Sequence, residues 1–418
     1  MTRRIDFARV IAARYLSKAG SEAAFFIGVW GKAAFDFQAT AGQLAIVMLT
    51  LSLVSIVGSV IGGVLVDRFG PRRTLIGAEM LFAPAALAIV FADSLTSLTV
   101  LAAVWGFVGA PVMTAGASFA PFLAEDEQQL TKVNAWLEAA GSAAFVTGPA
   151  AGAFIVHYVN IDWVFYLDAI TSVIAAVLIW QARLVRPVRH APHGRVLADF
   201  REGVRVVYRM RSLRFYVLAG SVAWLGFGAF SALEPLFYRD AVGTSIEALG
   251  YINSLFGVGI LVGSYALTRL PRRVISARGL SVTLILSGLG SLAYVGTTDL
   301  RFIAMGAVAW GVVLGVMEPL LRTLVHRDSP EGLVGRITGT AMVHRQAGEL
   351  VPLAFAPTLA ATFGVQATLI GGGLLISVIA VLALNEAGAI DRERGSQVLR
   401  EVPIASFPID EDQLGPVM

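Results

Sequence analysis

Long apolar runs alternate with short polar connections along this chain. A transmembrane helix needs about 20 mostly apolar residues, and the pattern contains twelve such segments. The connections are short except for residues 184–214, which divide the segments six and six. The pattern predicts spanning helices at 10–34, 41–66, 75–92, 97–122, 133–158, 162–183, 215–238, 246–268, 279–297, 300–325, 336–362 and 364–385.

The composition agrees with this pattern. Of the 418 residues, 56% are hydrophobic and 15% are charged, whereas an average soluble domain is about 45–50% apolar and about 25% charged. Cysteine is absent, which excludes disulfides, cysteine–zinc sites, thiol catalysis and iron–sulfur ligation. The chain is therefore predicted to be an all-α, multi-pass membrane protein.

Basic residues favour one side of this arrangement. They gather after the second, eighth and tenth predicted spans and in the central segment, whereas the opposite loops hold only Arg239 and Arg301. Because cytoplasmic loops carry an excess of Lys and Arg, both termini and the central segment are predicted to be cytoplasmic, in a cell (inner or plasma) membrane. This distribution explains the net charge of +3 without a nucleic-acid partner. Residues 1–20 lack the apolar core and cleavage site of a signal peptide.

The span pattern also predicts the domain organisation. We expect an N-terminal six-helix bundle at 1–183 and a C-terminal six-helix bundle at 215–385. A basic linker at 184–214 joins them, and a polar tail at 386–418 is expected to be loose. Apolar residues at helical spacing from Leu197 to Phe215 predict a basic amphipathic helix on the inner membrane face. A plain connector that carries topology charges is the alternative.

The two predicted bundles carry matching residues. A shift of 200 residues aligns Gly63 with Gly263, Pro71 with Pro271, Arg72 with Arg272, Arg73 with Arg273, and Ser59 with Gly259. Small residues four apart let two membrane helices approach closely. Matching six-span halves predict two pseudo-symmetric bundles with a substrate path at their interface, near the bilayer midplane.

The connection after the second span holds a dense motif. It reads Gly63-Val64-Leu65-Val66-Asp67-Arg68-Phe69-Gly70-Pro71-Arg72-Arg73. Gly63 allows close packing, Gly70 permits a tight turn, and Asp67 can cap a helix or pair with an arginine. The motif closely resembles the cytoplasmic signature of the major facilitator superfamily, with Pro71 where an arginine is usual.

This resemblance implies the twelve-helix major facilitator fold, a monomer and no cofactor. It also implies a gate made of Gly63, Asp67, Arg68, Gly70, Arg72 and Arg73, in which the aspartate latches the two halves in the outward-facing state. The second half has Leu267 in place of the aspartate, so only the first latch is complete.

A second motif lies in the fifth span. Gly148-Pro149-Ala150-Ala151-Gly152 resembles the antiporter motif of the same superfamily, which implies export; an ordinary proline kink is the alternative. Shorter stretches are similar to the drug-efflux branch that contains the macrolide exporters and the enterobactin exporter: Asn134-Ala135, Asp168 to Ser172, Phe200 to Gly203, Pro235 to Tyr238 and Gly335 to Ile337. The fourth span lacks the arginine that many proton antiporters carry.

Charges inside the spans need a reason, because a charge at mid-bilayer costs at least ~2.5–3.5 kcal/mol. Lys18 with Glu22, and Glu318 with Arg322, have the i,i+4 spacing of helical ion pairs. Lys32 follows Lys18 by 14 residues and is expected on nearly the same face. The resemblance implies that spans 1, 4, 7 and 10 line a central cavity, which makes Glu22, Glu234 and Glu318 candidates to face it.

The functional hypothesis is that Glu22 or Glu234 alternates between protonated and ionised forms. A carboxyl in a dehydrated cavity holds a proton more readily than one in water, so proton and cationic substrate can compete for it. Asp168 in the sixth span is a further candidate for proton or substrate binding. Permanent ion pairs are the alternative for Glu22 and Glu318, and a helix-start or packing role is the alternative for Asp168. Aromatic candidates for contact with a bulky substrate are Phe25, Phe26, Trp30, Trp105, Trp224, Phe227, Phe230 and Trp310.

No nucleotide-binding phosphate loop, metal-ligand cluster or hydrolase motif occurs in the sequence. The partners expected are therefore a small-molecule substrate, protons and the lipid bilayer, and the chain is not expected to be an enzyme. The sequence favours secondary transport by alternating access, as proton-coupled efflux of drugs or other amphiphilic compounds. Export of one physiological product such as a siderophore, which Lys18 and Lys32 would suit, is the first alternative. An importer or facilitator, and a non-transporting receptor or enzyme, are the others.

Overall fold

The computed structural model describes residues 2–124, 127–182 and 196–401. Within these ranges the fold consists of helices without strands, which confirms the all-α prediction. The long helices are α1 (Thr2–Ala23), α2 (Ala41–Phe69), α3 (Pro71–Ile89), α4 (Leu95–Ala117), α5 (Glu127–Tyr158), α6 (Asp162–Gln181), α8 (Arg211–Leu236), α9 (Ile246–Leu267), α10 (Ala277–Val295), α11 (Leu300–Asp328), α12 (Val334–Phe363) and α13 (Val365–Glu401). The remaining elements are the shorter helix α7 (Val196–Arg209), π-helical turns η1 (Ala24–Val29), η2 (Lys32–Asp36) and η4 (Phe237–Val242), and 3₁₀ turns η3 (Ala120–Phe122) and η5 (Arg272–Val274).

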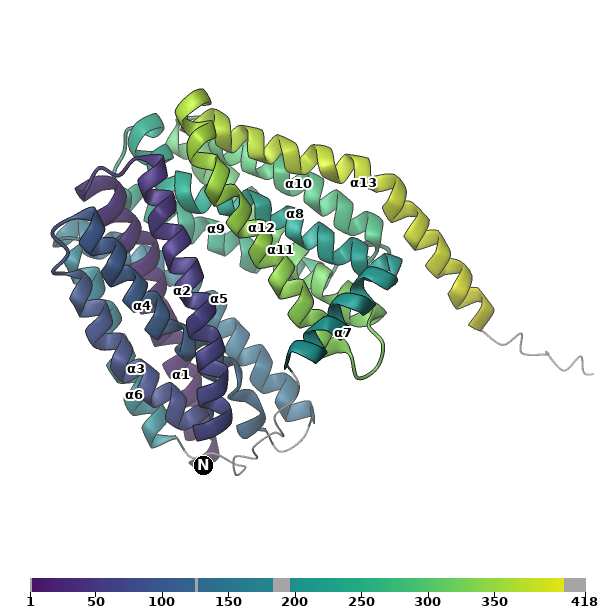
Figure 1. The fold of residues 1–418 in the computed structure, drawn as a ribbon, viewed down its shortest axis with the longest axis horizontal. Coiled ribbons are helices and arrows are strands. Elements are labelled where there is room, and N and C mark those ends of the chain that lie inside the picture. Colours follow the sequence, from purple (N-terminus) through teal and green to yellow (C-terminus); the bar gives the residue numbers. More distant parts are fainter. Residues whose placement is uncertain (1, 125–126, 183–195, 402–418) are drawn as a thin grey trace, which may run out of the picture.

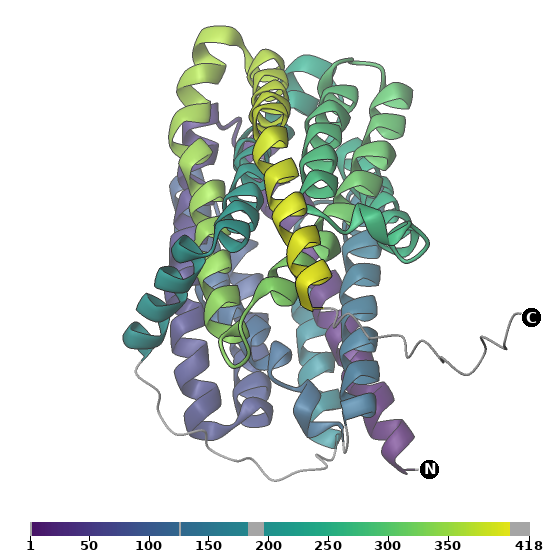
Figure 2. The same ribbon diagram turned by 90° about the vertical axis from the view of Figure 1, so that its right-hand side faces the viewer.

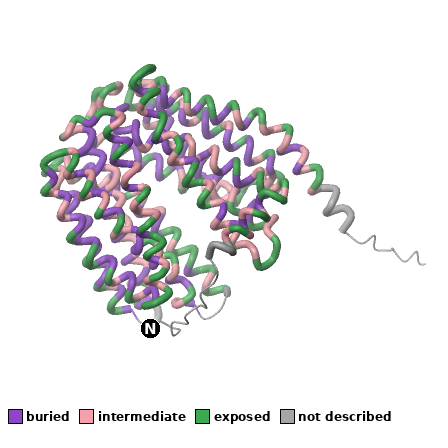
Figure 3. Tube along the Cα trace, viewed as in Figure 1, coloured by how far each residue is buried: buried purple, intermediate pink, exposed green. Residues whose placement is uncertain are grey.

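Most of the long helices are suited to a bilayer. In the described part of the chain, nine are long and apolar enough to cross a membrane. The other three long helices are α1, α3 and α12, and each holds at least three charged residues. Exposed residues lie mainly along the outside of the molecule and buried residues mainly inside it (Figure 3). Many of the exposed side chains are large and apolar, as a lipid-facing surface requires. The chain is therefore a multi-pass membrane protein.

Helix packing repeats between the two halves. In the first half α2 packs on α4, α1 on α5 and α6, and α3 on α4 and α6. In the second half α9 packs on α11, α8 on α12 and α13, and α10 on α11 and α13. The contacts between halves follow the same rule, since α5 packs on α9 and α12 packs on α2. The six-and-six pseudo-symmetry is therefore present in the packing as well as in the span count.

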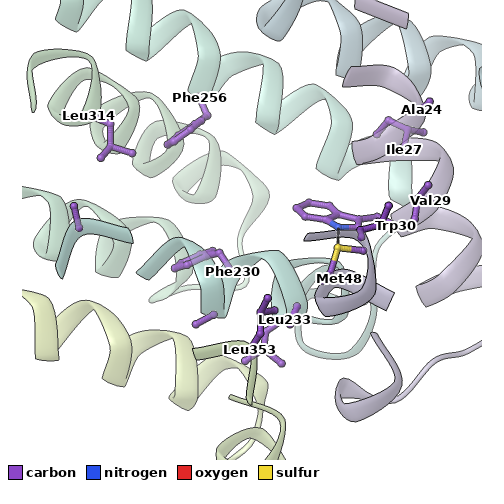
Figure 4. Packing of buried hydrophobic residues seen from close by; sticks show 14 of the residues in the cluster. Ala24, Ile27, Val29, Trp30, Met48, Phe230, Leu233, Phe256, Leu314 and Leu353 are labelled. Carbon is purple, nitrogen blue, oxygen red and sulfur yellow. Dashed lines mark hydrogen bonds between the residues drawn. The ribbon is translucent and has the colours of Figure 1, made fainter. Parts of the chain in front are cut away.

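The two bundles meet at one end and diverge toward the other (Figure 1). The N-terminus and α7 lie toward the diverging end (Figures 1 and 2). At the meeting end, Arg239 of η4 donates through Nη1 to the carbonyl oxygens of Ala34 (2.6 Å) and Ala39 (3.1 Å) in the first bundle. A buried cluster also joins the bundles there: Trp30 donates to the sulfur of Met48 (3.4 Å), and Phe230 and Leu233 belong to the same cluster (Figure 4).

Glycines bring helices into close contact in both halves, but Gly63, which was expected to do so, does not. A methyl group added at Gly263 would lie 2.0 Å from the Val312 carbonyl oxygen of α11. In the first half the equivalent contact with α4 is made by Gly58 and Gly62, whose added methyl groups would lie 2.5 Å and 2.9 Å from α4 backbone atoms. Nothing lies within 4 Å of the same position at Gly63. The predicted packing role of Gly63 within its own bundle is therefore wrong, because the packing face is one residue earlier.

The segment predicted as a loose tail from residue 386 begins as helix, because α13 continues to Glu401. Its acidic residues explain the continuation. Asp391 accepts hydrogen bonds from the backbone N–H groups of Ala277 (2.9 Å) and Arg278 (3.0 Å) at the start of α10. Glu386 accepts two bonds from Arg211, at 2.6 Å and 2.7 Å. Residues 402–418 lie outside the described residues.

The central linker forms one helix and part of a second. The predicted amphipathic helix from Leu197 to Phe215 is interrupted at Met210, whose backbone is extended (φ −92°, ψ 118°). Residues from Arg211 onward belong to α8, the first long helix of the second bundle. Residues 183–195 lie outside the described residues.

Candidate functional site

An aromatic cavity of about 220 Å³ lies between the two bundles. The first bundle contributes Phe25, Phe26, Trp30 and Phe145, and the second contributes Trp224, Phe227, Phe230, Phe256, Tyr294 and Trp310. Of the eight aromatic candidates from the sequence, only Trp105 does not line it. The cavity has the usual make-up of a small-molecule site, with many apolar side chains and a few polar ones.

The rings on the second-bundle side form a continuous set. Phe227 stacks on Trp224 (centroids 4.7 Å apart) and on Trp310 (5.7 Å). Phe256 meets Trp310 edge-on at 5.3 Å. Such a wall offers flat, polarisable surface to a hydrophobic or cationic ligand.

Glu234 is the buried carboxylate of this cavity. It lies on α8 directly before Pro235, and the whole residue is 7% exposed. Its Oε1 accepts hydrogen bonds from Tyr294 Oη of α10 (2.5 Å) and from Asn253 Nδ2 of α9 (3.4 Å). Within the described ranges no cationic side chain pairs with it, which agrees with the prediction that Glu234 has no local ion-pair partner.

The hydroxyl groups around Glu234 form a directed chain. Tyr294 has one hydroxyl proton and gives it to Glu234, so its contact with Tyr238 Oη (2.9 Å) requires Tyr238 to donate. When Glu234 carries a proton, it can donate to Tyr294 instead, and the direction of both bonds can reverse. The buried network therefore fits either charge state of the carboxyl without moving a heavy atom.

Glu318 lies in a neighbouring cavity of about 110 Å³, together with Arg322 and Arg345. The alternative of a permanent pair with Arg322 is wrong: Glu318 accepts a hydrogen bond from Trp224 Nε1 (3.1 Å) and pairs with Arg345 of α12 (3.9 Å). Arg345 also lies over the Trp224 ring, 4.0 Å from its centroid. Glu318 lies on α11, and α11 and α12 both pack against α8. This packing brings Arg345 to Glu318, which the spacing within one helix could not show.

Both candidate lysines are paired with acids. Lys18 Nζ lies 3.2 Å from Glu22, as predicted, and Lys32 Nζ lies 2.7 Å from Asp162 of α6. Between the two lysines the chain passes through the π-helical turn η1, so a count at 3.6 residues per turn does not give their relative direction. Neither lysine lines the aromatic cavity, and neither does Glu22.

Asp168 is enclosed inside the first bundle. It is fully buried and accepts hydrogen bonds from Trp105 Nε1 (2.9 Å) and Ser21 Oγ (3.3 Å). These contacts tie α6 to α4 and α1, which fits the packing role that the sequence left open. They also explain Trp105, whose ring packs on Phe82, 5.3 Å away, instead of facing the cavity.

The motif between α2 and α3 lies at the diverging end of the first bundle. Gly70 adopts a positive φ of 80°, and Pro71 begins α3, so the predicted tight turn is confirmed. Arg72 donates to the Trp180 carbonyl oxygen at the end of α6. Asp67, Arg68 and Arg73 are exposed, which leaves Asp67 accessible to a partner from the second bundle.

The Gly148-Pro149-Gly152 motif lies where three helices cross. A methyl group added at Gly148 would lie 2.6 Å from the Ala19 carbonyl oxygen, and one at Gly152 would lie 2.9 Å from Ile27. On the other side, Gly250 of α9 packs against the Pro149 carbonyl oxygen (2.9 Å from an added methyl). The motif therefore forms the contact of α5 with α1 and with the second bundle.

Sequence reasoning missed Tyr294 and Asn253. Both are uncharged polar residues within predicted apolar spans. Because buried polar groups need hydrogen-bond partners, their position in a span was a signal that could have identified them. Their link to Glu234 depends on the packing of α9 and α10 against α8, which no sequence spacing expresses.

Comparisons with known proteins agree with this architecture. Residues 15–352 match the sequence model of the Major Facilitator Superfamily. The chain is 25% identical over 386 residues to the multidrug efflux pump Tap of Mycobacterium tuberculosis, covering 88% of this chain and 91% of that protein. It is 24% identical over 265 residues to a bicyclomycin resistance protein homolog of Haemophilus influenzae (62% and 64% covered), and 23% identical over 232 residues to macrolide efflux protein A of Streptococcus pyogenes (52% and 57%).

Among solved structures, the nucleoside transporter NupG has a similar fold. The TM-score is 0.72 at 10% identity, covering 90% of this chain and 99% of that chain. The matching fold, the paired bundles with a cavity between them and the family match over most of the sequence lead to one assignment. The chain belongs to the Major Facilitator Superfamily and is a transporter rather than an enzyme.

Proposed function

We propose that the chain exports amphiphilic small molecules, drugs among them, by alternating access coupled to proton entry. The observation that carries this proposal is a single one: a cavity walled by aromatic rings from both bundles holds one buried carboxyl, Glu234, without a cationic partner among the described residues. The efflux relatives support the direction of transport.

Competition at Glu234 supplies the coupling. An ionised carboxylate in the cavity attracts a cationic substrate, and the aromatic wall holds its apolar part. A proton that reaches Glu234 removes this attraction and releases the substrate. Loading substrate from inside and protons from outside then exchanges one for the other.

The ion pairs of Lys18 and Lys32 favour a cationic substrate over an anionic product. Lys18 and Lys32 were the sequence features that suited a siderophore, but each is bound to a carboxylate at 3.2 Å or less, and neither faces the cavity. The cavity is lined instead by two carboxylates, the buried Glu234 and the half-buried Glu349 of α12.

In the proposed cycle, the observed arrangement of the bundles is one of two alternating states. With the predicted orientation, the bundles are closed at the outer end and apart at the cytoplasmic end. In the opposite state the cytoplasmic ends meet, and Asp67 becomes the latch that the motif implies.

Replacing the latch carboxylate, Asp67→Asn, is expected to slow cycling about tenfold, because a charge-assisted bond is worth about 1.5–3 kcal/mol. Substrate affinity should be unchanged, since Asp67 lies at the far end of α2 from the cavity. Efflux rate and equilibrium binding of a fluorescent substrate measure the two effects. An unaltered efflux rate would remove the latch role.

The closed end gives a complementary prediction. Arg239→Gln removes the two bonds to Ala34 and Ala39 and should raise the fraction of molecules open to the outside about tenfold. Because the chain has no cysteine, a single Ser231→Cys probe in the cavity can be labelled with a membrane-impermeant thiol reagent. Labelling from outside should rise in Arg239→Gln and stay unchanged in the control Arg301→Gln.

Export itself is tested by accumulation of ethidium in cells that express the chain. The proposal predicts exclusion of ethidium that a protonophore abolishes. Exclusion that persists after the proton gradient collapses would contradict proton coupling, and increased uptake would favour an importer or facilitator.

A further inference from the structure

A second large cavity, of about 1000 Å³, lies in the second bundle, away from the aromatic cavity. It is walled by the α9–α10 connection, α10, α11 and the end of α13. Its rim lies at the end of the bundle that carries the basic connections, and its floor runs toward the middle of α10 and α11. The proposed transport cycle gives it no role, although Arg273, which lines it, is the counterpart of Arg73 in the 200-residue repeat.

The rim is strongly basic. Arg273, Arg278, Arg327 and Arg394 all line the cavity, against one lining carboxylate, Asp391. Asp391 is committed to the two backbone N–H groups that begin α10, and the nearby Asp328 is shared by Arg327 and Arg394. In the described part of the chain, Arg273 and Arg278 form no ion pair, so four guanidinium groups face two carboxylates and a net positive charge is left.

The walls below the rim are apolar and open to the side. Val282 and Leu286 of α10 line the cavity and are 46% and 45% exposed. Leu286 follows Arg278 by eight positions of α10, which is about 12 Å along the helix axis. This length is a large part of one leaflet of a hydrocarbon core about 30 Å thick. The cavity thus joins a cationic rim at the membrane border to an apolar slot at acyl-chain depth.

We propose that this groove binds an anionic phospholipid, with the phosphate at Arg273 and Arg278 and an acyl chain along Val282 and Leu286. A soluble phosphate would use the rim but leave the slot without a partner, and a neutral lipid would leave the arginines without one. Basic pockets between membrane helices are suited to acidic head groups. The proposal requires only that these helices span a bilayer, and it is independent of the transported substrate.

The test is native mass spectrometry of the purified full chain in detergent with equal amounts of phosphatidylglycerol and phosphatidylcholine. The wild type should retain phosphatidylglycerol preferentially. Arg273→Gln and Arg278→Gln should each lower its retention about fivefold, as expected for one basic residue near an anionic lipid. The control Arg301→Gln, an exposed arginine at the opposite end of the bundle, should leave retention unchanged.

Three results would overturn the proposal: equal retention of the two lipids, equal loss in the control variant, or displacement of phosphatidylglycerol by the same concentration of glycerol phosphate, which would indicate a soluble-anion site. A second experiment leaves every arginine in place. A photo-crosslinking amino acid at Leu286 should capture phosphatidylglycerol in vesicles that contain both lipids. The same group at Leu382, an exposed residue of α13 outside this groove, should capture the two lipids in their bulk ratio.

Discussion

Glu234→Gln is expected to abolish proton-coupled efflux of cationic substrates. Glutamine has the shape of the protonated carboxyl, so it keeps the hydrogen bond from Tyr294 to Oε1 and the local fold. It cannot ionise, and the loss of a buried charge that pairs with a ligand costs about 2–5 kcal/mol. Affinity for a cation such as ethidium should therefore fall at least about thirtyfold.

The same variant separates a proton site from a purely structural one. Binding of an uncharged hydrophobic substrate should survive in Glu234→Gln, and its transport should lose dependence on pH. Ligand titrations at two pH values measure both properties. The matched control is Glu331→Gln, which neutralises an exposed carboxylate between α11 and α12 and should behave as wild type. A pH-dependent Glu234→Gln would mean that another group carries the proton.

Gly263→Ala is the prediction with the largest effect on folding. The added methyl group would lie 2.0 Å from the Val312 carbonyl oxygen, so α9 and α11 would have to separate. Overpacking of this kind costs about 1–3 kcal/mol, and more where the obstacle is backbone. We expect a large loss of thermal stability and of monodisperse protein after extraction.

Neighbouring glycines in the first half supply the control. Gly62→Ala meets the α4 backbone at Pro111, 2.9 Å away, and should be destabilising, whereas Gly63→Ala meets nothing within 4 Å. Thermal unfolding of the two variants distinguishes the observed packing face from the one predicted by the 200-residue repeat. Stability lost in Gly63→Ala and kept in Gly62→Ala would contradict the observed register.

Much of the architecture was accessible from local sequence features. In the described part of the chain, nine of the twelve long helices are long and apolar enough to cross a bilayer. Such runs are readable from sequence because lipid requires the backbone hydrogen bonds of a crossing segment to be satisfied within a helix. The turn at Gly70-Pro71 was predictable for a similar reason, since glycine tolerates the positive φ and proline suits the first position of α3. The same applies to Lys18 with Glu22, which lie one turn apart on one helix.

Contacts between residues on different helices could not be predicted from the sequence. Arg322 has the right spacing for Glu318, yet Arg345 from α12 is the residue that pairs with it. Tyr294 meets Glu234 across 60 residues of sequence. The acidic residues of the expected tail looked like a solvated end, but Asp391 caps α10 and Glu386 holds Arg211. Each of these contacts depends on which helices pack together, and the residue spacing along a single helix does not give that information.

The most direct test of the central claim uses the purified chain in sealed vesicles that hold a pH-sensitive dye and no other transporter. With the chain present, an ethidium gradient should drive protons in the opposite direction, and Glu234→Gln should abolish this proton movement. Ethidium that crosses the wild-type vesicles without any change in internal pH would contradict proton-coupled export.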